Sequence, residues 1–306
     1  MTTRITLVTG AAGMIGFSVA LSLSRSGRTV LGTDVDQPAE SPPFAFERAD
    51  LRDFERLQAV AGASVDAIVH CGAISGPMLG KDRPKDLVDI NVGGTINALE
   101  IARRTAARRF VYCSTCMAYG HTPAGLSSVD EVAPLRADDT YGASKAAGEY
   151  MVRAFARANR VDAVSLRLCW VYGPRRRTEC LVNRLIVDAR TGQATRIPFG
   201  GGFHRQFVYV DDVVDAIRLA LDARSLPQRV YNVTGGERFT FDEIATVIGD
   251  VVAPTRPDFA PGPDPDDYLQ ERFTIDGIAT DLSWRPRHDL RAGVAAYAAW
   301  LRSHEF

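Results

Sequence analysis

The chain has 306 residues, 46% of them hydrophobic, which suffices for a sizeable core in one large α/β domain or in two lobes around a cleft. Its 36 Lys and Arg nearly balance 37 Asp and Glu, so a formal charge of −1 favours neither nucleic acid nor an anionic membrane as partner. Five Cys at spacings unlike a secreted disulfide scaffold, no apolar run of about 18 residues and no signal-peptide pattern predict a reduced, cytoplasmic protein.

Short apolar runs alternate with longer helical patterns through the first two-thirds of the chain. Strands are predicted at 4–9, 28–34, 66–71, 109–114, 162–168 and 229–233, and helices at 14–26, 53–61, 84–105, 141–159, 179–191 and 211–223. Because nearly continuous apolar strands alternate with helices, the pattern predicts an α/β fold with a doubly wound parallel sheet. Further on, 253–267 holds five prolines and four aspartates and predicts an irregular surface segment, before a last helix at 292–302.

Three glycines follow the first predicted strand and open the first helix. Gly10, Gly13 and Gly16 have the spacing G-x-x-G-x-x-G, which lets the backbone turn tightly at a helix N-terminus where N–H groups can bind a pyrophosphate. Asp34 ends the second strand, where a carboxylate binds the ribose hydroxyls of NAD and repels the 2′-phosphate of NADP. The alternative for Asp34 is a turn cap. The context predicts a dinucleotide site that prefers NAD.

Further residues are expected along this cofactor site. Asp50 and Leu51 end the next strand and could reach the adenine, although Asp50 could equally cap the helix at 53–61. The small residues at 71–73 would let the backbone pass close to the cofactor. Asn91 is a polar residue between apolar neighbours. It is expected either to tie its helix to a neighbouring strand or to have a purely structural role.

A tyrosine and a lysine one helical turn apart are the catalytic candidates. Tyr141 and Lys145 share one helix face, and a lysine ammonium can lower the pKa of a phenol, which is otherwise about 10, far enough for it to act as a base. By itself this spacing also describes a chance surface pair. A strand that ends in hydroxyls precedes it, and Thr115, with Ser114 as the alternative, is expected to share the hydrogen bond of the reacting alcohol. The expected cofactor residues are Gly10, Gly13, Met14, Ile15, Gly16, Asp34, Asp50, Leu51, Cys71, Gly72, Ala73, Asn91, Cys113, Tyr141 and Lys145.

With these residues the chain resembles the extended short-chain dehydrogenases/reductases, specifically the NAD-dependent epimerase/dehydratase family and its UDP-glucose 4-epimerase-like group. The resemblance covers nearly the whole chain. It rests on Gly10, Gly13, Gly16, Asp34 and Asp276 and on the stretches 70–73, 91–95, 114–120, 141–145, 167–174, 205–212, 231–233 and 282–286.

The resemblance implies a Rossmann-type NAD-binding domain, 1–171 plus 206–233, and a smaller discontinuous C-terminal substrate lobe, 172–205 plus 234–306. It maps the catalytic hydroxyl, base and ammonium onto Thr115, Tyr141 and Lys145, with NAD as the cofactor and no metal. It also implies a homodimer formed through the helices that match 91–105 and 141–159. The implied substrate is a sugar alcohol carbon, most often in a nucleotide-sugar.

The chain departs from the family at the substrate end. Most sugar-nucleotide members carry Asn at the position of Trp170, and tend to carry a diphosphate-binding Arg near the position of Asp266. The surrounding aspartates are expected to repel a diphosphate, although Arg205 is retained and the arginines at 175–177 form either an anion site or a solvated face. The expected substrate residues are Ser75, Thr115, Trp170, Arg177 and Arg205.

Three functions are consistent with these features. The first is an epimerase or dehydratase acting on a nucleotide-sugar, although Cys116 and Met117 stand where a dehydratase places an acidic pair. The alternative is an NAD-dependent dehydrogenase of a free sugar, sugar acid or other hydroxy acid. The third, a non-catalytic NAD-binding module, is disfavoured by the intact Thr115, Tyr141 and Lys145. The C-x-x-C spacing of Cys113 and Cys116 lacks a second pair and is not expected to bind metal or act in redox chemistry.

Overall fold

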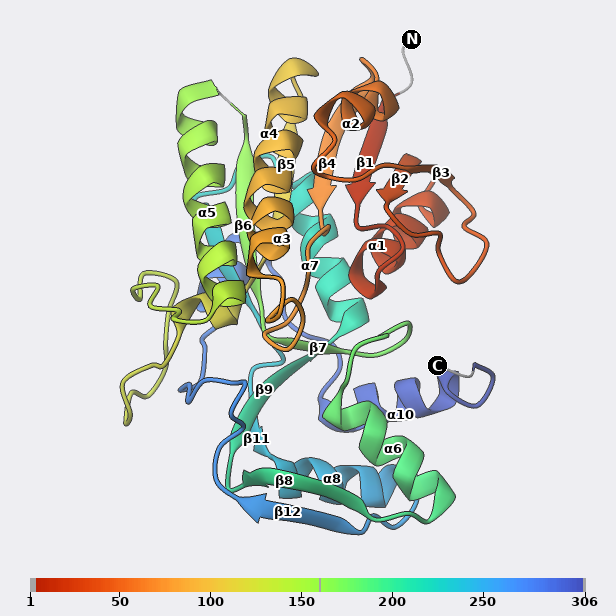
Figure 1. Cartoon of the computed structure of the whole chain (residues 1–306), viewed down its shortest axis with the longest axis vertical. Coiled ribbons are helices and arrows are strands. Elements are labelled where there is room, and N and C mark those ends of the chain that lie inside the picture. Colours follow the sequence, from red (N-terminus) through yellow and green to blue (C-terminus); the bar gives the residue numbers. More distant parts are fainter. Residues whose placement is uncertain (1–3, 160, 305–306) are drawn as a thin grey trace.

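A parallel sheet of seven strands carries the fold. The computed structural model describes residues 4–159 and 161–304, and the sheet has the order β10-β6-β5-β4-β1-β2-β3 (Figure 1). Every neighbouring pair in it is parallel. The predicted doubly wound α/β fold is therefore confirmed. Its strands are β1 (Ile5–Thr9), β2 (Thr29–Asp34), β3 (Ala45–Arg48), β4 (Val65–His70), β5 (Arg109–Thr115), β6 (Ala163–Leu168) and β10 (Val230–Val233).

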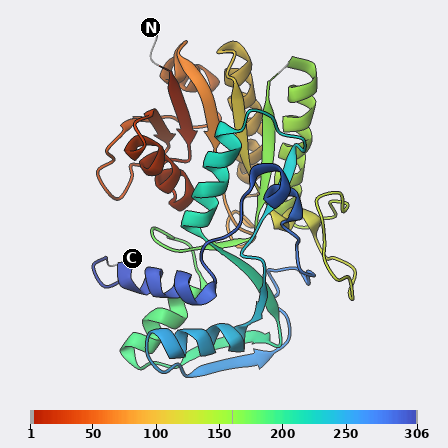
Figure 2. The same cartoon turned by 180° about the vertical axis from the view of Figure 1, so that it is seen from behind.

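Helices cover both faces of this sheet, because successive strand residues point to opposite sides. Leu7 and Phe110 pack in one apolar core, whereas their neighbours Val8 and Val111 pack in the other. Viewed from behind, α7 lies on the face opposite α4 and α5 (Figure 2). One face carries α2 (Phe54–Ala61), α4 (Gly94–Arg104) and α5 (Thr140–Asn159), and the other carries α1 (Met14–Arg25) and α7 (Val210–Asp222).

Two smaller sheets lie below the carboxyl ends of these strands (Figure 1). One joins β11, β9 and β7, and the other joins β12 and β8. The core that contains Val8 continues without interruption to Leu185 and Phe241, so the small sheets share apolar packing with the large one. The two-domain division is a prediction. The remaining helices are α3 (Pro84–Val88), α6 (Leu181–Thr191), α8 (Phe241–Val251), α9 (Asp276–Leu282) and α10 (Leu290–Trp300), with short helical turns at Asp89–Gly93 and Cys116–Tyr119. The strands of the small sheets are β7 (Trp170–Tyr172), β8 (Thr195–Gly201), β9 (His204–Tyr209), β11 (Arg238–Thr240) and β12 (Pro257–Pro261).

The Pro- and Asp-rich segment 253–267 is more ordered than the sequence predicts. It contains β12, which pairs in parallel with β8, and the side chains of Asp264 and Asp267 are only 10% and 2% exposed. Burial is possible because Arg205 forms ion pairs with both carboxylates. The prediction of irregular structure is therefore wrong for Pro257–Pro261, and the prediction of a surface position is wrong for the side chains of Asp264 and Asp267. None of the described helices combines the length and apolar composition needed to cross a membrane.

Candidate active site

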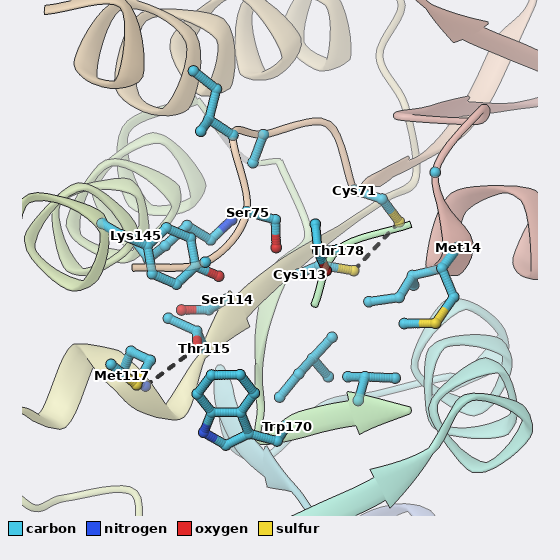
Figure 3. Close-up of a pocket in the computed structure, with 18 of the residues that line it drawn as sticks. Met14, Cys71, Ser75, Cys113, Ser114, Thr115, Met117, Lys145, Trp170 and Thr178 are labelled. Atoms are coloured by element: carbon cyan, nitrogen blue, oxygen red, sulfur yellow. Dashed lines mark hydrogen bonds between the residues drawn. The ribbon is translucent and has the colours of Figure 1, made fainter. Parts of the chain in front are cut away.

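One cavity of about 380 Å³ opens at the carboxyl ends of β1, β4, β5 and β6, where ligands of doubly wound sheets bind. In Figure 3, Ser75, Thr115 and Lys145 project into the same space above Trp170, and Met14 and Cys71 line the other end. The structure brings together all the predicted cofactor and substrate residues except Asn91. Those that line the cavity are Gly10, Gly13, Met14, Ile15, Gly16, Asp34, Asp50, Leu51, Cys71, Gly72, Ala73, Ser75, Cys113, Thr115, Tyr141, Lys145, Trp170, Arg177 and Arg205.

Two glycines of the turn that joins β1 to α1 lie where a side chain would not fit. A Cβ on Gly10, whose φ is +68°, would lie 2.7 Å from the backbone nitrogen of Gly72, and a Cβ on Gly16 would lie 2.1 Å from the carbonyl oxygen of Gly10. Gly13 caps α1 without a side chain, so the first N–H groups of the helix can bind a ligand. This cradle fits the pyrophosphate of a dinucleotide.

Asp34 lies at the edge of the same cavity and is held by the backbone. Its Oδ2 accepts a hydrogen bond from the N–H of Ala12 (3.0 Å), and its Oδ1 accepts one from Val35 (2.7 Å). The carboxylate thus stabilises the glycine turn and still lines the cavity. Asp50 hydrogen-bonds to Arg52, and this bond lowers the pKa of Asp50.

Three hydroxyls meet at the other end of the cavity. Thr115 is the last residue of β5, Tyr141 is the second residue of α5, and Ser75 lies on the loop after β4. Burial raises the pKa of Tyr141, and the neighbouring hydroxyls of Ser75 and Thr115 act in the opposite direction. Thr115 also accepts a hydrogen bond from the N–H of Met117 (3.2 Å), which fixes its side chain (Figure 3).

Lys145 is buried beside these hydroxyls, but the described residues include no hydrogen bond between it and Tyr141. Its Nζ lies 4.3 Å from the centroid of the Tyr112 ring. Burial lowers the pKa of Lys145 to about 8, opposed by Cys113, Cys71 and Glu149. The lowering of the Tyr141 pKa by Lys145 therefore stays a prediction.

Replacing Lys145 with Met is expected to increase the free energy of unfolding by about 3 kcal/mol near pH 7. Below about pH 8 the lysine is protonated in both the folded and the unfolded state, and the folded state bears the cost of the buried charge. As the pH rises from about 8 to 10.5, the folded wild type loses this proton before the unfolded chain does, so the wild type gains stability and the difference shrinks. Urea unfolding of both proteins at about pH 8 and at about pH 10.5 measures the difference in their free energy of unfolding. A variant less stable than the wild type at pH 7 would contradict the expectation.

Glu149, which the sequence analysis did not identify, lies one turn after Lys145. It accepts hydrogen bonds from the hydroxyl of Ser114 (2.5 Å) and from Nη2 of Arg167 (2.7 Å), and the side chains of the ion pair are each 5% exposed. Because Ser114 is engaged by Glu149, Thr115 is the strand-end hydroxyl that faces Tyr141. The spacing of four residues from Lys145 was the available signal for Glu149.

Asn91 supports the site from behind rather than lining it. It lies in a π turn, Asp89–Gly93, between α3 (Pro84–Val88) and α4. Its side chain accepts from the N–H of Ile74 (2.8 Å) and donates to the carbonyl of Ile74 (3.0 Å) and to the hydroxyl of Ser144 (2.9 Å). It thereby joins the loop that carries Ser75 to the helix that carries Tyr141.

Arg205 is paired with two carboxylates at one end of the cavity. It forms ion pairs with Asp264 and, at 2.7 Å, with Asp267, and its guanidinium carbon lies 3.9 Å from the centroid of the Trp170 ring. Two of the aspartates that the sequence suggested would repel a diphosphate, Asp264 and Asp267, pair with the retained arginine, whereas Asp266 pairs with Lys81. Arg177 is exposed at the rim of the cavity.

Four thiols line the cavity, in pairs that the sequence spacing did not predict. Cys71 lies 3.4 Å from Cys113, and Cys169 lies 3.0 Å from Cys116 (Sγ to Sγ; the first pair is drawn in Figure 3). Cys113 and Cys116 therefore each face a neighbouring strand rather than each other. All four are free thiols.

Comparisons with known proteins agree with this geometry. The model of the NAD dependent epimerase/dehydratase family matches residues 6–234. The chain is 31% identical to a UDP-glucose 4-epimerase of Mycolicibacterium smegmatis, over 97% of this chain and 98% of that protein. It is 32% identical to a dTDP-glucose 4,6-dehydratase of Streptomyces griseus, over 99% and 95%.

Solved structures share the fold over almost the whole chain. A UDP-glucose 4-epimerase of Thermus thermophilus in complex with NAD superimposes with a TM-score of 0.85 at 28% identity, over 98% of this chain and 99% of that one. A Thermotoga maritima UDP-glucose 4-epimerase with UDP-glucose reaches a TM-score of 0.91 at 23% identity, with 98% and 99% covered, which shows the shared fold. The chain is an NAD-dependent enzyme of the extended short-chain dehydrogenase/reductase type, and it belongs to the NAD dependent epimerase/dehydratase family.

Proposed function

We propose that this enzyme removes a hydride from an alcohol carbon of a sugar, with Tyr141 as the base, Thr115 as the hydrogen-bonding hydroxyl and Lys145 as the ammonium that supports the tyrosinate. The observation that carries the proposal is the meeting of the Ser75, Thr115 and Tyr141 hydroxyls beside a buried lysine. A phenol that lies beside two hydroxyls can pass a proton to and from a substrate oxygen placed between them.

Each residue then has one task in the reaction. Tyr141 accepts the hydroxyl proton of the substrate, and Thr115 donates a hydrogen bond to the same oxygen. Lys145 supplies positive charge at this end of the cavity, which favours the tyrosinate. Bound NAD supplies the hydride acceptor, and the glycine turn with Asp34 would hold its pyrophosphate and ribose.

The first candidate reaction is the 4-epimerisation of a nucleotide-sugar. Full-length similarity to UDP-glucose 4-epimerases supports it. In such a reaction the ketone turns in the site before the hydride returns to the opposite face, so no net NADH forms. Homodimer formation through α4 and α5 belongs to the same proposal and is open to light scattering.

The second candidate is a dehydrogenase that releases the oxidised product of a free sugar or sugar acid. The neutralised charge of Arg205 favours it, because a diphosphate needs unpaired cations and this arginine already has two carboxylate partners. Trp170, stacked on Arg205, narrows the same end of the cavity.

Near-ultraviolet absorbance of NADH separates the candidates. Purified enzyme with excess NAD is given UDP-sugars, free sugars and sugar acids in turn. Sustained NADH formation with a free sugar or acid supports the dehydrogenase, whereas an epimer formed from a UDP-sugar without NADH supports the epimerase. Absence of both with every compound would contradict the proposed chemistry on sugars.

Replacing Asp34 with Asn is expected to weaken NAD binding about tenfold and to narrow the preference over NADP, because the ribose hydroxyls lose a charged acceptor. Asn keeps one oxygen for the N–H of Ala12, so the glycine turn is largely preserved. Fluorescence titration with both cofactors measures the change. An unaltered NAD to NADP ratio would remove Asp34 from the ribose site.

A further inference from the structure

The positive charges that line the cavity are not equally available to a ligand. Arg175 forms an ion pair with Glu40 (2.8 Å), Arg205 is paired with Asp264 and Asp267, and Arg238 is paired with Glu271 (2.6 Å). The exceptions among the cavity arginines are Arg176 and Arg177, for which the described part of the chain provides no carboxylate within ion-pair distance.

Arg176 is the one of these two that lies inside the site. It is half-buried, and its guanidinium carbon lies 5.9 Å from the centroid of the Trp170 ring. Its Nη1 and Nη2 donate to the carbonyls of Val171 (2.6 Å) and Glu179 (3.2 Å), which fixes the side chain. Arg176 lines the same cavity as Tyr141. Burial raises the pKa of Tyr141, and the charge of Arg176 acts in the opposite direction.

The hydrogen bonding of Arg176 is also incomplete. Its Nε is buried and has no hydrogen-bond partner within 4–159 and 161–304. A guanidinium has five N–H donors, and the two backbone carbonyls leave others unused. A half-buried cation without a counter-charge is costly, and a planar carboxylate is an anion whose geometry matches its donors.

Building on the proposed hydride transfer, we propose that Arg176 binds the carboxylate of a sugar acid, and that this enzyme therefore acts on a free sugar acid rather than on a nucleotide-sugar. Arg176 provides an uncompensated cation beside Trp170 near the reacting hydroxyls, whereas the arginine at the diphosphate end is already neutralised within the chain. A neutral sugar leaves Arg176 unpaired, so the site discriminates between a carboxylate and a hydroxymethyl group.

Calorimetric titration tests this without requiring turnover. Wild-type enzyme saturated with NAD is titrated with D-glucuronate and D-galacturonate, with their neutral counterparts D-glucose and D-galactose, and with UDP-glucose. Arg176→Gln is expected to weaken binding of the acid about 10²-fold and to leave the neutral sugars within about twofold. Arg176→Lys should recover part of the loss, because it restores the charge without the planar donors. Arg190→Gln, a change of an exposed arginine on α6 away from the cavity, is the matched control and should leave binding of acids and neutral sugars within about twofold.

Several results would overturn the inference. For the wild type, these are tighter binding of UDP-glucose than of both acids, or failure of both acids to bind. For Arg176→Gln, they are equal losses of affinity for acids and neutral sugars, or a comparable loss of NAD affinity, which would assign Arg176 to the cofactor. The proposed hydride transfer is judged separately by the dependence of turnover on Tyr141. If the acids bind through Arg176 and turnover survives the loss of the Tyr141 hydroxyl, the substrate inference stands and the catalytic proposal falls. If UDP-glucose alone binds and reacts through Tyr141, the catalytic proposal stands and the substrate inference falls.

Discussion

Tyr141→Phe is expected to lower kcat by about 10²–10⁴-fold while NAD affinity stays close to that of the wild type. The phenol lies in the cavity with the hydroxyls of Ser75 and Thr115, so its removal takes away the proposed proton acceptor and leaves the cavity shape largely intact. The glycine turn that fits the pyrophosphate lies at the other end of the cavity. Steady-state kinetics on the substrate found in the absorbance screen, with a parallel NAD titration, measure the effect.

Tyr150→Phe is the matched control, since Tyr150 lies on the same helix and is 48% exposed. It should leave kcat within about twofold. Turnover in Tyr141→Phe equal to that of the control would exclude Tyr141 as the base. A parallel loss of NAD binding would indicate instead that the phenol supports the cofactor site.

Glu149→Leu is expected to reduce the free energy of unfolding by about 3–5 kcal/mol. The substitution leaves the guanidinium of Arg167 buried without its counter-charge, and it frees the hydroxyl of Ser114 on the catalytic strand. Helix α5 would lose its polar connection to β5 and β6, which also position Thr115. Chemical denaturation of both proteins at one pH gives the difference.

The double variant Glu149→Leu with Arg167→Met should recover much of this loss, because an apolar pair replaces the stranded charge. Glu100→Gln serves as a surface comparison, since Glu100 pairs with Arg103 and Arg104 on exposed turns of α4 and should cost at most about 1 kcal/mol. A Glu149→Leu variant no less stable than Glu100→Gln would show that the buried pair contributes little.

Local sequence patterns were sufficient to predict the parallel sheet and the glycine turn. Apolar strand runs predicted the parallel sheet, and the glycines after the first strand predicted the turn that the structure contains at Gly10 and Gly16. Helix α8 was not predicted, although Thr240 and Glu243 form a capping box and their T-x-x-E spacing is a recognisable signal for the start of a helix.

Contacts between residues far apart in the sequence could not be predicted from the spacing of residues along the chain. Arg205 is bonded to partners 59 and 62 positions away, and nothing in the local pattern around Asp264 or Asp267 indicates burial. Charge alone suggested repulsion of a ligand, because the sequence does not show which arginine the carboxylates meet. The thiol pairs were missed for the same reason, since neighbouring strands bring together residues 42 and 53 positions apart.

The buried ion pairs of Arg205 have a consequence for how a ligand is received. Asp264, Asp267 and the ring of Trp170 already hold the guanidinium in one orientation in the free protein. That wall of the cavity is preorganised, so ligand binding does not incur the loss of about 0.5–1.5 kcal/mol of conformational entropy for each side chain that would otherwise have to be immobilised. Selectivity at this end of the site then comes from a fixed shape rather than from adaptation to the ligand.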